Sequence, residues 1–327
     1  MQQRQLGQGG PMVSAIGLGC MSFGGMYGPT GLAESLRCLD AAWDHGITFY
    51  DTANIYGMGV SETVLGEWLA RRKHEVVLAT KASIISGPPR RIDNSAEHLR
   101  GELEASLRRL GRERVELFYI HRRDASVPHE ALAETLERLI AEGKIGGYGL
   151  SEVAPATIRA MHALLPCRAV QNEYSLWTRQ PELGVTRACA DLGIAFVPFS
   201  PLGRGIFSQE PLDPESFPPA DFRRSNPRFA APNFEVNQRF IANFRAFCKA
   251  RGWNVAAAAM AWILQQPGGM LPIPGTRTAE HLADWARADQ LIFSPEDWTE
   301  IDRLLPPGFA QGARYGETQR ASVEEYC

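Results

Sequence analysis

Four polar residues stand at or just beyond the ends of apolar runs, where a sheet presents side chains that do chemistry. Asp51 and Tyr56 lie in FYDTANIYG, Lys81 ends VVLATK, and His121 ends VELFYIH. Asp51, Lys81 and His121 would end consecutive parallel strands, so we expect them to meet at the same end of a sheet. Tyr56 would lie on the loop above that end. Together the four residues predict an enzyme with a proton-donating site.

A tyrosine needs help to act as an acid near neutral pH, because a free phenol has a pKa of about 10. Lys81 would lower the pKa of Tyr56 by stabilising the phenolate, and Asp51 would keep Lys81 charged and oriented. Lowering that pKa by about three corresponds to roughly 4 kcal/mol. His121 would orient a carbonyl oxygen by donating a hydrogen bond. Each residue alone is more often a cap, a surface ion pair or a hydrogen-bonded core residue, and their joint placement favours catalysis.

The elements that must position these residues alternate along the chain. The predicted strands are Ser14–Gly19, Ile47–Asp51, Glu75–Thr80, Val115–His121, Gly147–Ser151, Ala169–Gln171, Ala195–Ser200 and Leu271–Pro274. The predicted helices are Glu34–Asp44, Glu62–Arg72, Ala96–Leu110, His129–Glu142, Pro155–Leu164, Glu182–Leu192, Asn237–Arg251 and Thr278–Arg287, with an extra helix at Ala256–Gln265. The predicted helix N-caps are Ser61 and Ser95, and the glycines predicted to end helices are Gly46, Gly111, Gly143 and Gly193.

This alternation predicts an α/β fold, a closed (β/α)8 TIM barrel, in a single domain. An open doubly wound sheet is the alternative, but the first strand, AIGLGC, is not followed by a G-x-G-x-x-G turn. Two segments break the alternation. Residues 208–237 are rich in Pro and Asp, and residues 306–327 are also aperiodic. Because long irregular connections are usually functional, we expect both to lie over the active-site face of a domain spanning 1–327.

Composition narrows the class of protein. The chain has 327 residues and a net charge of −3, which gives no reason to expect nucleic acid or a membrane as a partner. No apolar stretch approaches the roughly 20 residues that span a bilayer, and the polar start MQQRQLGQGG lacks the core of a signal peptide. We therefore expect a cytoplasmic protein. No C-x-x-C pair indicates a metal site, and we expect reduced, mostly buried thiols at Cys20, Cys38, Cys167, Cys189, Cys248 and Cys327.

Several stretches in order resemble the aldo-keto reductase family over almost the whole chain. They are IGLGCMSFGGMYG, TFYDTANIYGMGVSE, LATK, FYIHRRD, GLSE, VQNEYSLW, FVPFSPLGRG and PIPGTR, and DFRRSNPRF and SLWTR resemble most the auxin-induced and aryl-alcohol dehydrogenase-like branch of bacteria and plants. The resemblance implies a (β/α)8 barrel and NAD(P)H-dependent reduction of aldehydes or ketones. It also implies that Tyr56 is the general acid, that Lys81 and Asp51 tune it, and that His121 orients a small-molecule carbonyl substrate.

The resemblance also implies where the cofactor binds. Ser151 and Gln171 correspond to residues that bind the carboxamide, and Phe199 to the residue that stacks on the nicotinamide ring. The loop SPLGRG would wrap the pyrophosphate, and Arg277 would bind a 2′-phosphate, which favours NADPH over NADH. The implied cofactor-binding residues are Cys20, Met21, Asp51, Ser151, Gln171, Phe199, Ser200, Pro201, Leu202, Gly203, Arg204, Gly205, Gly275, Thr276, Arg277, His281 and Asp284. On its own, Phe199 would be read as a core residue and SPLGRG as a plain turn.

The sequence departs from the family in two places. Residues 281–285 read HLADW instead of a Leu-Glu-Glu-Asn-like adenine contact, so we expect altered adenine binding, with stacking on Trp285 as one form of it. Ala82 and Ser83 stand where the branch usually has Phe and Gly. The expected walls of the substrate pocket are Phe23, Tyr27, Arg122, Trp177 and Arg179. Arg122 and Arg123 could attract an anionic substrate, although exposed arginines are usually only solvated.

Two other functions fit parts of this pattern. One is a regulatory subunit that binds NADPH with little turnover, as channel-associated barrels of the resembled family do. The other is an unrelated barrel lyase in which Lys81 forms a Schiff base with a carbonyl substrate. The sequence names neither the physiological carbonyl compound nor the oligomeric state, because pocket specificity resides in variable loops.

Overall fold

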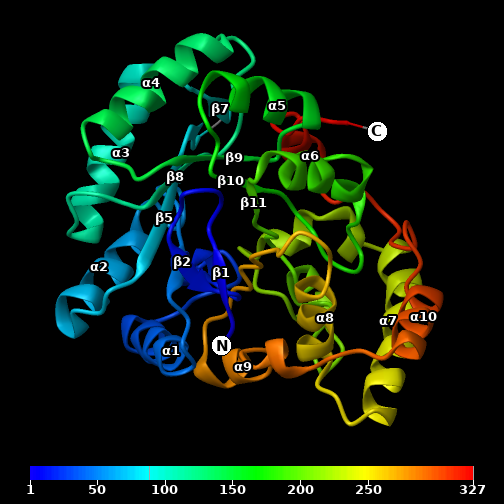
Figure 1. Ribbon diagram of the computed structural model, residues 1–327. Helices are drawn as coiled ribbons and strands as arrows, with labels where there is room; N and C mark the ends of the chain where they lie inside the picture. Colours follow the sequence, from blue (N-terminus) through cyan, green and yellow to red (C-terminus); the bar gives the residue numbers. More distant parts are fainter. Residues whose placement is uncertain (88, 327) are drawn as a thin grey trace.

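A closed barrel of parallel strands, surrounded by helices, forms the centre of the computed structural model, which describes residues 1–87 and 89–326 (Figure 1). Seven strands are hydrogen-bonded in the order β11-β10-β9-β8-β5-β4-β3. An eighth segment joins the two edges, because Ile273 N donates to Pro198 O (3.0 Å) and Gly19 N donates to Pro274 O (2.9 Å). The predicted (β/α)8 barrel is thereby confirmed.

The elements have the following bounds. The strands are β1 (Gln3–Gln5), β2 (Met12–Ser14), β3 (Leu18–Gly19), β4 (Phe49–Asp51), β5 (Val77–Ala82), β6 (Ile84–Ile85), β7 (Arg91–Ile92), β8 (Leu117–Ile120), β9 (Tyr148–Ser151), β10 (Ala169–Gln171) and β11 (Ala195–Phe196). The helices are α1 (Leu32–Asp44), α2 (Val60–Arg72), α3 (Ala96–Leu110), α4 (His129–Ala141), α5 (Pro155–Leu164), α6 (Val185–Leu192), α7 (Asn233–Ala250), α8 (Val255–Leu264), α9 (Ala279–Ala283), α10 (Pro295–Leu304) and α11 (Glu317–Arg320).

Prolines explain why the eighth barrel segment forms only isolated bridges. Residues 271–274 read LPIP, and a proline has no backbone N–H to donate. Leu271 and Ile273 donate toward the seventh strand, whereas Pro272 and Pro274 only accept, from Gly17 and Gly19 of the first barrel strand. The predicted strand Leu271–Pro274 therefore lies in the barrel wall with hydrogen bonds on both sides.

The predicted first strand, Ser14–Gly19, combines parts of two elements. Ser14 ends β2, which pairs antiparallel with β1, and only β3 lies in the barrel wall. Figure 1 shows the hairpin of β1 and β2 (dark blue) lying across the barrel. Leu6 and Val13 pack there against interior residues such as Phe49 and Leu117. The hairpin thus closes the amino-terminal end of the barrel and leaves the other end for a site.

Most helix bounds agree with prediction within two residues, and the exceptions have local causes. Helix α6 begins at Val185 instead of residue 182 because Gly184 separates it from a 3₁₀ turn at Gln180–Leu183. Helix α7 begins at Asn233, inside the segment predicted to be irregular, and α9 has five residues instead of the predicted ten. The prediction missed α10, which begins with a capping box at Ser294, and also missed α11.

The predicted caps are confirmed in all but one case. Ser95 caps α3 by accepting from His98 N (3.3 Å), and the glycines 46, 111, 143 and 193 have positive φ at the ends of helices. Ser61 is the exception: α2 begins at Val60, its N-cap is Gly59, and the Ser61 hydroxyl donates to Cys20 O (2.8 Å). Ser61 therefore ties α2 to the barrel wall and does not begin the helix.

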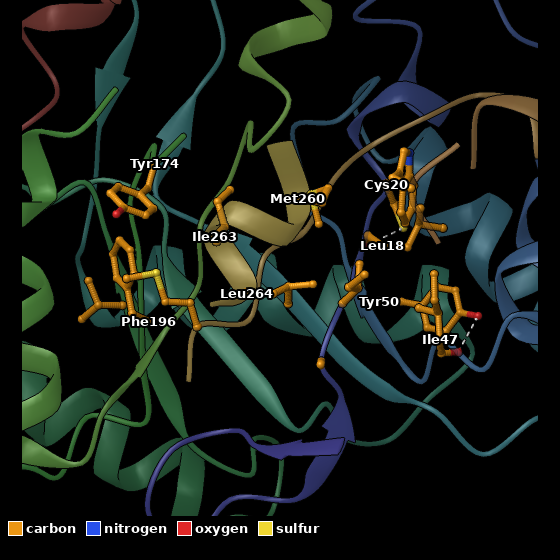
Figure 2. Packing of buried hydrophobic residues seen from close by; sticks show 14 of the residues in the cluster. Leu18, Cys20, Ile47, Tyr50, Tyr174, Phe196, Met260, Ile263 and Leu264 are labelled. Carbon is orange, nitrogen blue, oxygen red and sulfur yellow. Dashed lines mark hydrogen bonds between the residues drawn. The ribbon is translucent and has the colours of Figure 1, made fainter. Parts of the chain in front are cut away.

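Two apolar clusters hold the barrel together. In the larger cluster, Figure 2 shows Leu18, Ile47 and Tyr50 on one side and Tyr174 with Phe196 on the other. The Tyr50 hydroxyl is satisfied within the core by Ile47 O (3.1 Å). The smaller cluster fills the barrel interior. Five cysteines of the described chain are buried and free, whereas Cys327 lies outside the described residues. Within residues 1–87 and 89–326, no helix combines the length and apolar character needed to cross a membrane.

The segment 208–237 and the tail that follows α10 are tied to each other. Asn226 donates to Arg314 O (2.8 Å), and Asn237 donates to Gln311 O (3.0 Å) and accepts from Gln311 N (2.7 Å). Farther along the tail, Glu324 N donates to the carbonyl of Glu152, directly after β9 (3.1 Å). The tail therefore contacts the carboxyl end of a barrel strand.

We predict that Gly149→Ala destabilises the barrel by about 1–3 kcal/mol, because overpacking a filled interior strains its neighbours. A Cβ at Gly149 in β9 would lie 2.5 Å from the Tyr119 ring and 2.8 Å from Ala169 O. Urea unfolding of wild type and variant measures the change. Gly101→Ala is the matched control, since Gly101 is exposed within α3 with open space around it, and should stabilise by about 0.5–1 kcal/mol. Equal effects of both changes would contradict the prediction.

Candidate active site

The four residues predicted to do chemistry come together at the carboxyl ends of β4, β5 and β8. The Lys81 ammonium donates to the Asp51 carboxylate and to Thr52 O (2.8 Å). It lies 5.2 Å from the centroid of the Tyr56 ring, within hydrogen-bonding reach of the phenol. The rings of Tyr56 and His121 meet edge to face, with centroids 6.0 Å apart. The ends of β4, β5 and β8 and the loop that carries Tyr56 thus bring the four side chains together.

Lys81 and Asp51 form an ion pair inside the barrel. The Lys81 side chain is 0% exposed and that of Asp51 is 2% exposed. The second carboxylate oxygen of Asp51 accepts from the Gln171 amide (2.8 Å). Burial alone would lower the pKa of Lys81. The combined effects of Asp51 and Tyr56 are larger and opposite, so the pKa of Lys81 lies above its usual value. Lys81 is therefore a fixed ammonium, held by partners on β4 and in the loop that follows it.

The pKa of Tyr56 differs from the sequence-based expectation. Burial of the hydroxyl raises this pKa above its usual value, outweighing the lowering effect of Lys81, while Asp51 adds a smaller upward effect. The expected net lowering is therefore wrong: Asp51 cancels part of the field of Lys81, and desolvation does the rest. At neutral pH Tyr56 carries its proton, which is the form that a proton donor needs.

Close backbone contact fixes the loop that carries Tyr56. A Cβ at Gly24 would lie 2.5 Å from Tyr56 C and from Gly57 N, and Gly57 itself has a φ of 62°. The 3₁₀ turn Met21–Gly24 therefore packs directly against the peptide that follows Tyr56. Only glycine allows this approach, and the contact determines where the phenol points.

His121 is a neutral imidazole. Burial lowers its pKa well below the usual value, and the cations Arg122, Lys81 and Arg90 lower it further. Its Nδ1 is buried and has no hydrogen-bond partner among the described residues. A neutral histidine carries one N–H and can donate one hydrogen bond from its ring.

The residues predicted to bind nicotinamide lie beside this group. Ser151 ends β9 and Gln171 ends β10, and both are buried. Phe199 is partly exposed and forms bridges to residues 173 and 273. Gln171 donates to Asp51, and Ser151 accepts from the Arg122 guanidinium (3.2 Å). Two polar side chains therefore adjoin the four residues, and Phe199 lies in the barrel wall between residues 173 and 273.

The predicted pyrophosphate loop is tightly curled. Its φ angles are positive at Ser200 (50°), Gly203 (56°), Arg204 (60°) and Gly205 (97°). A Cβ at Gly203 would meet Ile206 at 2.7 Å, so only glycine fits there. Within the loop, Gly203 N donates to Ser200 O (2.9 Å) and Gly205 N donates to Leu202 O (3.0 Å), so these two N–H groups already have acceptors. The contact of this loop with a pyrophosphate stays a prediction.

Arg204 does not have the partner predicted for it. Its side chain is 3% exposed and pairs with Glu173 (2.8 Å), and its guanidinium lies 5.0 Å from the centroid of the Tyr315 ring. Because Glu173 neutralises the guanidinium inside the protein, Arg204 holds the loop to its neighbours instead of pointing at a phosphate.

The candidate cofactor-binding residues that follow the eighth barrel segment differ in their exposure to solvent. Gly275 is exposed and Arg277 is partly exposed, with one guanidinium nitrogen donating to Pro29 O (3.2 Å). Thr276 is buried. His281 is exposed, and its backbone N–H donates to the hydroxyl of Thr278, the N-cap of α9. Asp284 accepts from the Asn254 amide (2.9 Å). Trp285 is 1% exposed, so the proposed stacking of adenine on it is wrong.

Three further cofactor candidates have ordinary environments. Cys20 is fully buried, its N–H donates to Asp51 O (2.8 Å), and its carbonyl accepts from the Ser61 hydroxyl (2.8 Å). Met21 is partly exposed at the start of the 3₁₀ turn, and Leu202 is partly exposed beside the buried Pro201.

The predicted pocket walls are only partly assembled around Tyr56. Tyr27 contacts Phe222 of the 208–237 segment edge to face (4.8 Å between centroids). Trp177 is buried beside Phe207 and Phe229, Phe23 is buried in the core, and Arg122 is buried next to His121. Arg179 is not brought to the group, because it pairs with Glu182 (2.7 Å) and Asp302 (3.0 Å) near the outer helices.

Several buried residues at this end of the barrel were missed by sequence analysis. Glu152 and Glu173 lie just beyond β9 and β10 and pair with Arg314 and Arg204, which links the barrel to its two long segments. Glu152 also has a φ of 57°. Acidic residues immediately after predicted strands, in GLSE and VQNE, were the available signal. Arg90, Arg228 and Tyr315 gave none, since their partners are distant in sequence. In the described part of the chain, no group of three or more His, Cys, Asp or Glu could hold a metal ion.

Comparison with known proteins agrees with this geometry. Residues 15–306 match the model of the Aldo/keto reductase family. The chain is 38% identical over 319 residues to the "Probable aldo-keto reductase 1" of Glycine max, covering 96% of this chain and 92% of that protein. It is 35% identical over 315 residues to "Aldo-keto reductase yakc [NADP(+)]" of Schizosaccharomyces pombe, covering 94% and 93% respectively.

A solved structure shows the same fold. The glycerol dehydrogenase AKR11B4 from Gluconobacter oxydans superposes with a TM-score of 0.82 at 27% identity, covering 90% of this chain and 92% of that one. The family match extends across all the barrel strands and the four clustered residues. This chain therefore belongs to the aldo/keto reductase family, whose members carry out NAD(P)H-dependent carbonyl reduction.

Proposed function

We propose that this protein reduces aldehydes or ketones to alcohols with NADPH and that Tyr56 is its general acid. One observation carries the proposal: a protonated phenol lies against a buried ammonium–carboxylate pair and beside a neutral imidazole. An acid, a charge that stabilises its conjugate base and a hydrogen-bond donor are what protonation of a developing alkoxide requires.

The cofactor would lie along the side of the barrel from β9 to residues 275–277. Ser151 and Gln171 would bind the carboxamide, Phe199 would contact the ring, and the backbone of residues 200–205 would hold the pyrophosphate. When bound, the cofactor supplies the hydride. Partly exposed Arg277 would contact the 2′-phosphate, which supports NADPH as the preferred form, and the relative from Schizosaccharomyces pombe carries NADP(+) in its name.

The side chains of the site would divide the remaining work. His121 donates its one N–H to the carbonyl oxygen and fixes the orientation of the substrate. Tyr56 gives its proton to that oxygen as negative charge develops. Lys81 stabilises the phenolate that remains, and Asp51 with Thr52 O keeps the ammonium in place. Burial strengthens each of these interactions by excluding water.

The same geometry opposes the lyase alternative. A Schiff base requires a neutral amine with a free lone pair. Lys81 is instead fully buried and donates to Asp51 and Thr52 O, and its raised pKa keeps it charged. The regulatory alternative, NADPH binding with little turnover, makes the opposite prediction in the first experiment below.

We predict that Tyr56→Phe lowers kcat by at least about 100-fold, because general acid catalysis contributes on the order of 10² to 10⁴ in rate. NADPH should bind with unchanged affinity, since the ring and its contacts remain. Steady-state reduction of a panel of aldehydes and ketones, with titration of NADPH fluorescence, measures both quantities.

Wild-type protein that binds NADPH yet reduces nothing in the panel would support the regulatory alternative. Turnover retained by Tyr56→Phe would instead refute the role given to Tyr56. Thermal melting of both proteins controls for folding.

Cofactor preference should depend on Arg277. We expect Arg277→Met to weaken binding of NADPH by about 10-fold or more, since a charge-assisted contact to phosphate contributes about 1.5–3 kcal/mol. NADH lacks the 2′-phosphate and serves as the control, with no change expected. Equal losses of affinity for NADPH and NADH in fluorescence titrations would show that Arg277 does not bind the 2′-phosphate.

His121 should make the protein less stable as the pH falls. Above its ordinary pKa of about 6.5, histidine is neutral in both folded and unfolded chains. Below that value the unfolded chain takes up a proton while folded His121, with its lowered pKa, does not. Stability then falls by up to about 1.4 kcal/mol per pH unit, and His121→Gln should remove this contribution. Urea unfolding at pH 7.5 and pH 5.5 measures it, and parallel pH dependences would contradict a neutral His121.

A further inference from the structure

Two arginines beside His121 have no acidic partner in the described part of the chain. Arg122 follows His121 directly, and Arg90 lies just before the short strand β7, near enough to Arg122 for the two charges to interact. The Arg122 guanidinium donates only to neutral acceptors: His121 O (2.6 Å), Ser151 Oγ (3.2 Å) and Tyr315 OH (3.4 Å). The Nε atoms of both arginines are buried without a hydrogen-bond partner among the described residues.

The charge of this pair is not balanced nearby. Burial and then Arg122 lower the pKa of Arg90, and both arginines lower the pKa of His121. Tyr315 supplies no anion, because burial raises its pKa to about 12 and keeps it a neutral phenol. Two buried carboxylates at this end of the barrel already have cations: Asp51 pairs with Lys81, and Glu152 pairs with Arg314.

Arg122 is buried and Arg90 is partly buried. An unpaired charge held away from water is costly, and a ligand that supplies the counter-charge removes that cost. Arg123, which the sequence suggested as a partner of Arg122, does not share this role. Its guanidinium donates to Asp124 O and Val127 O of its own loop. Arg90 instead completes the pair, from a position 32 residues earlier in the chain.

The position of the pair indicates which ligand carries the anion. Arg122 acts electrostatically on both Tyr56 and His121, so it adjoins the reacting end of the site. The phosphate-binding segments proposed above, 200–205 and 275–277, belong to the seventh and eighth barrel strands, whereas Arg90 and Arg122 follow the third and fourth. A phosphate of the cofactor therefore has its own binding segments.

We propose that the substrate is a carbonyl compound that bears an oxyanion, a carboxylate or phosphate, and that Arg122 and Arg90 bind this anion beside Tyr56. The inference rests on the proposed reductase function. Guanidinium groups match the geometry of oxyanions and can bind them through two hydrogen bonds. The oxyanion would occupy the free donors of the pair while the carbonyl group contacts His121.

The test compares two para-substituted benzaldehydes of similar shape, 4-carboxybenzaldehyde and its methyl ester, in NADPH-dependent reduction. Wild type should prefer the acid by at least about 10-fold in kcat/KM. Arg90→Gln should abolish the preference through KM, with kcat for the ester unchanged. Arg91→Gln is the matched control, because Arg91 is exposed at the next position, and it should retain the preference.

Calorimetric titration provides a readout independent of turnover. Benzoate should bind wild type and Arg91→Gln at least about 10-fold more tightly than Arg90→Gln, and benzamide should bind none of them measurably. Inorganic phosphate in place of benzoate distinguishes a general oxyanion site from one that requires a carboxylate.

The outcomes separate the two proposals. Equal reduction of acid and ester by wild type, or loss of NADPH affinity in Arg90→Gln, would overturn the anion inference and leave the reductase function standing. Failure to reduce either aldehyde despite tight NADPH binding would count against the reductase function. In that case, loss of benzoate binding in Arg90→Gln alone would still support the oxyanion site, and equal binding by all three proteins would overturn it.

Discussion

The ion pair between Lys81 and Asp51 is the constraint on which the rest of the site depends. Two opposite charges inside a barrel are tolerated only if each keeps its partner and the remaining donors and acceptors are satisfied. Thr52 O, in the loop after β4, and the Gln171 amide, at the end of β10, meet that need. The pair therefore requires a closed barrel, because its partners come from strands on different sides of the wall. The eighth segment, with prolines at every second position, closes that wall.

The electrostatic balance of the site follows from this pair being nearly neutral as a unit. Asp51 cancels part of the field of Lys81, and burial is the largest influence on the protonation of Tyr56 and His121. Tyr56 keeps its proton and His121 stays neutral. A site assembled from uncharged donors over a neutralised pair can favour negative charge on a substrate oxygen without carrying a permanent anion itself. The attraction between the Lys81 ammonium and Tyr56 is strongest after Tyr56 has lost its proton and carries a negative charge.

Residue patterns predicted the barrel, the four clustered side chains and most helix bounds, because these depend on local periodicity and on where apolar runs end. They failed where contacts with segments distant in the sequence determine the partners and burial of a residue. Arg204 was predicted to bind the cofactor, but its guanidinium pairs with Glu173, and adenine was expected to stack on Trp285, whose ring is buried. The β1–β2 hairpin was missed because QRQ has no apolar alternation. Arg90 was missed because only folding brings it to Arg122.

The arginines at the carboxyl end of the barrel differ in whether they have a carboxylate partner, and the positions of Glu152 and Glu173 explain the difference. Near the long segments, Arg204 and Arg314 share Glu152 and Glu173. Burial lowers the pKa of Arg228, their neighbour, to about 10 despite Glu173, so that side is already saturated with positive charge. These carboxylates hold the segments in place, and neither pairs with Arg122, which reaches only the hydroxyl of Tyr315 on that side. Arg90 and Arg122 thus keep the unbalanced positive charge on which the proposed oxyanion site rests.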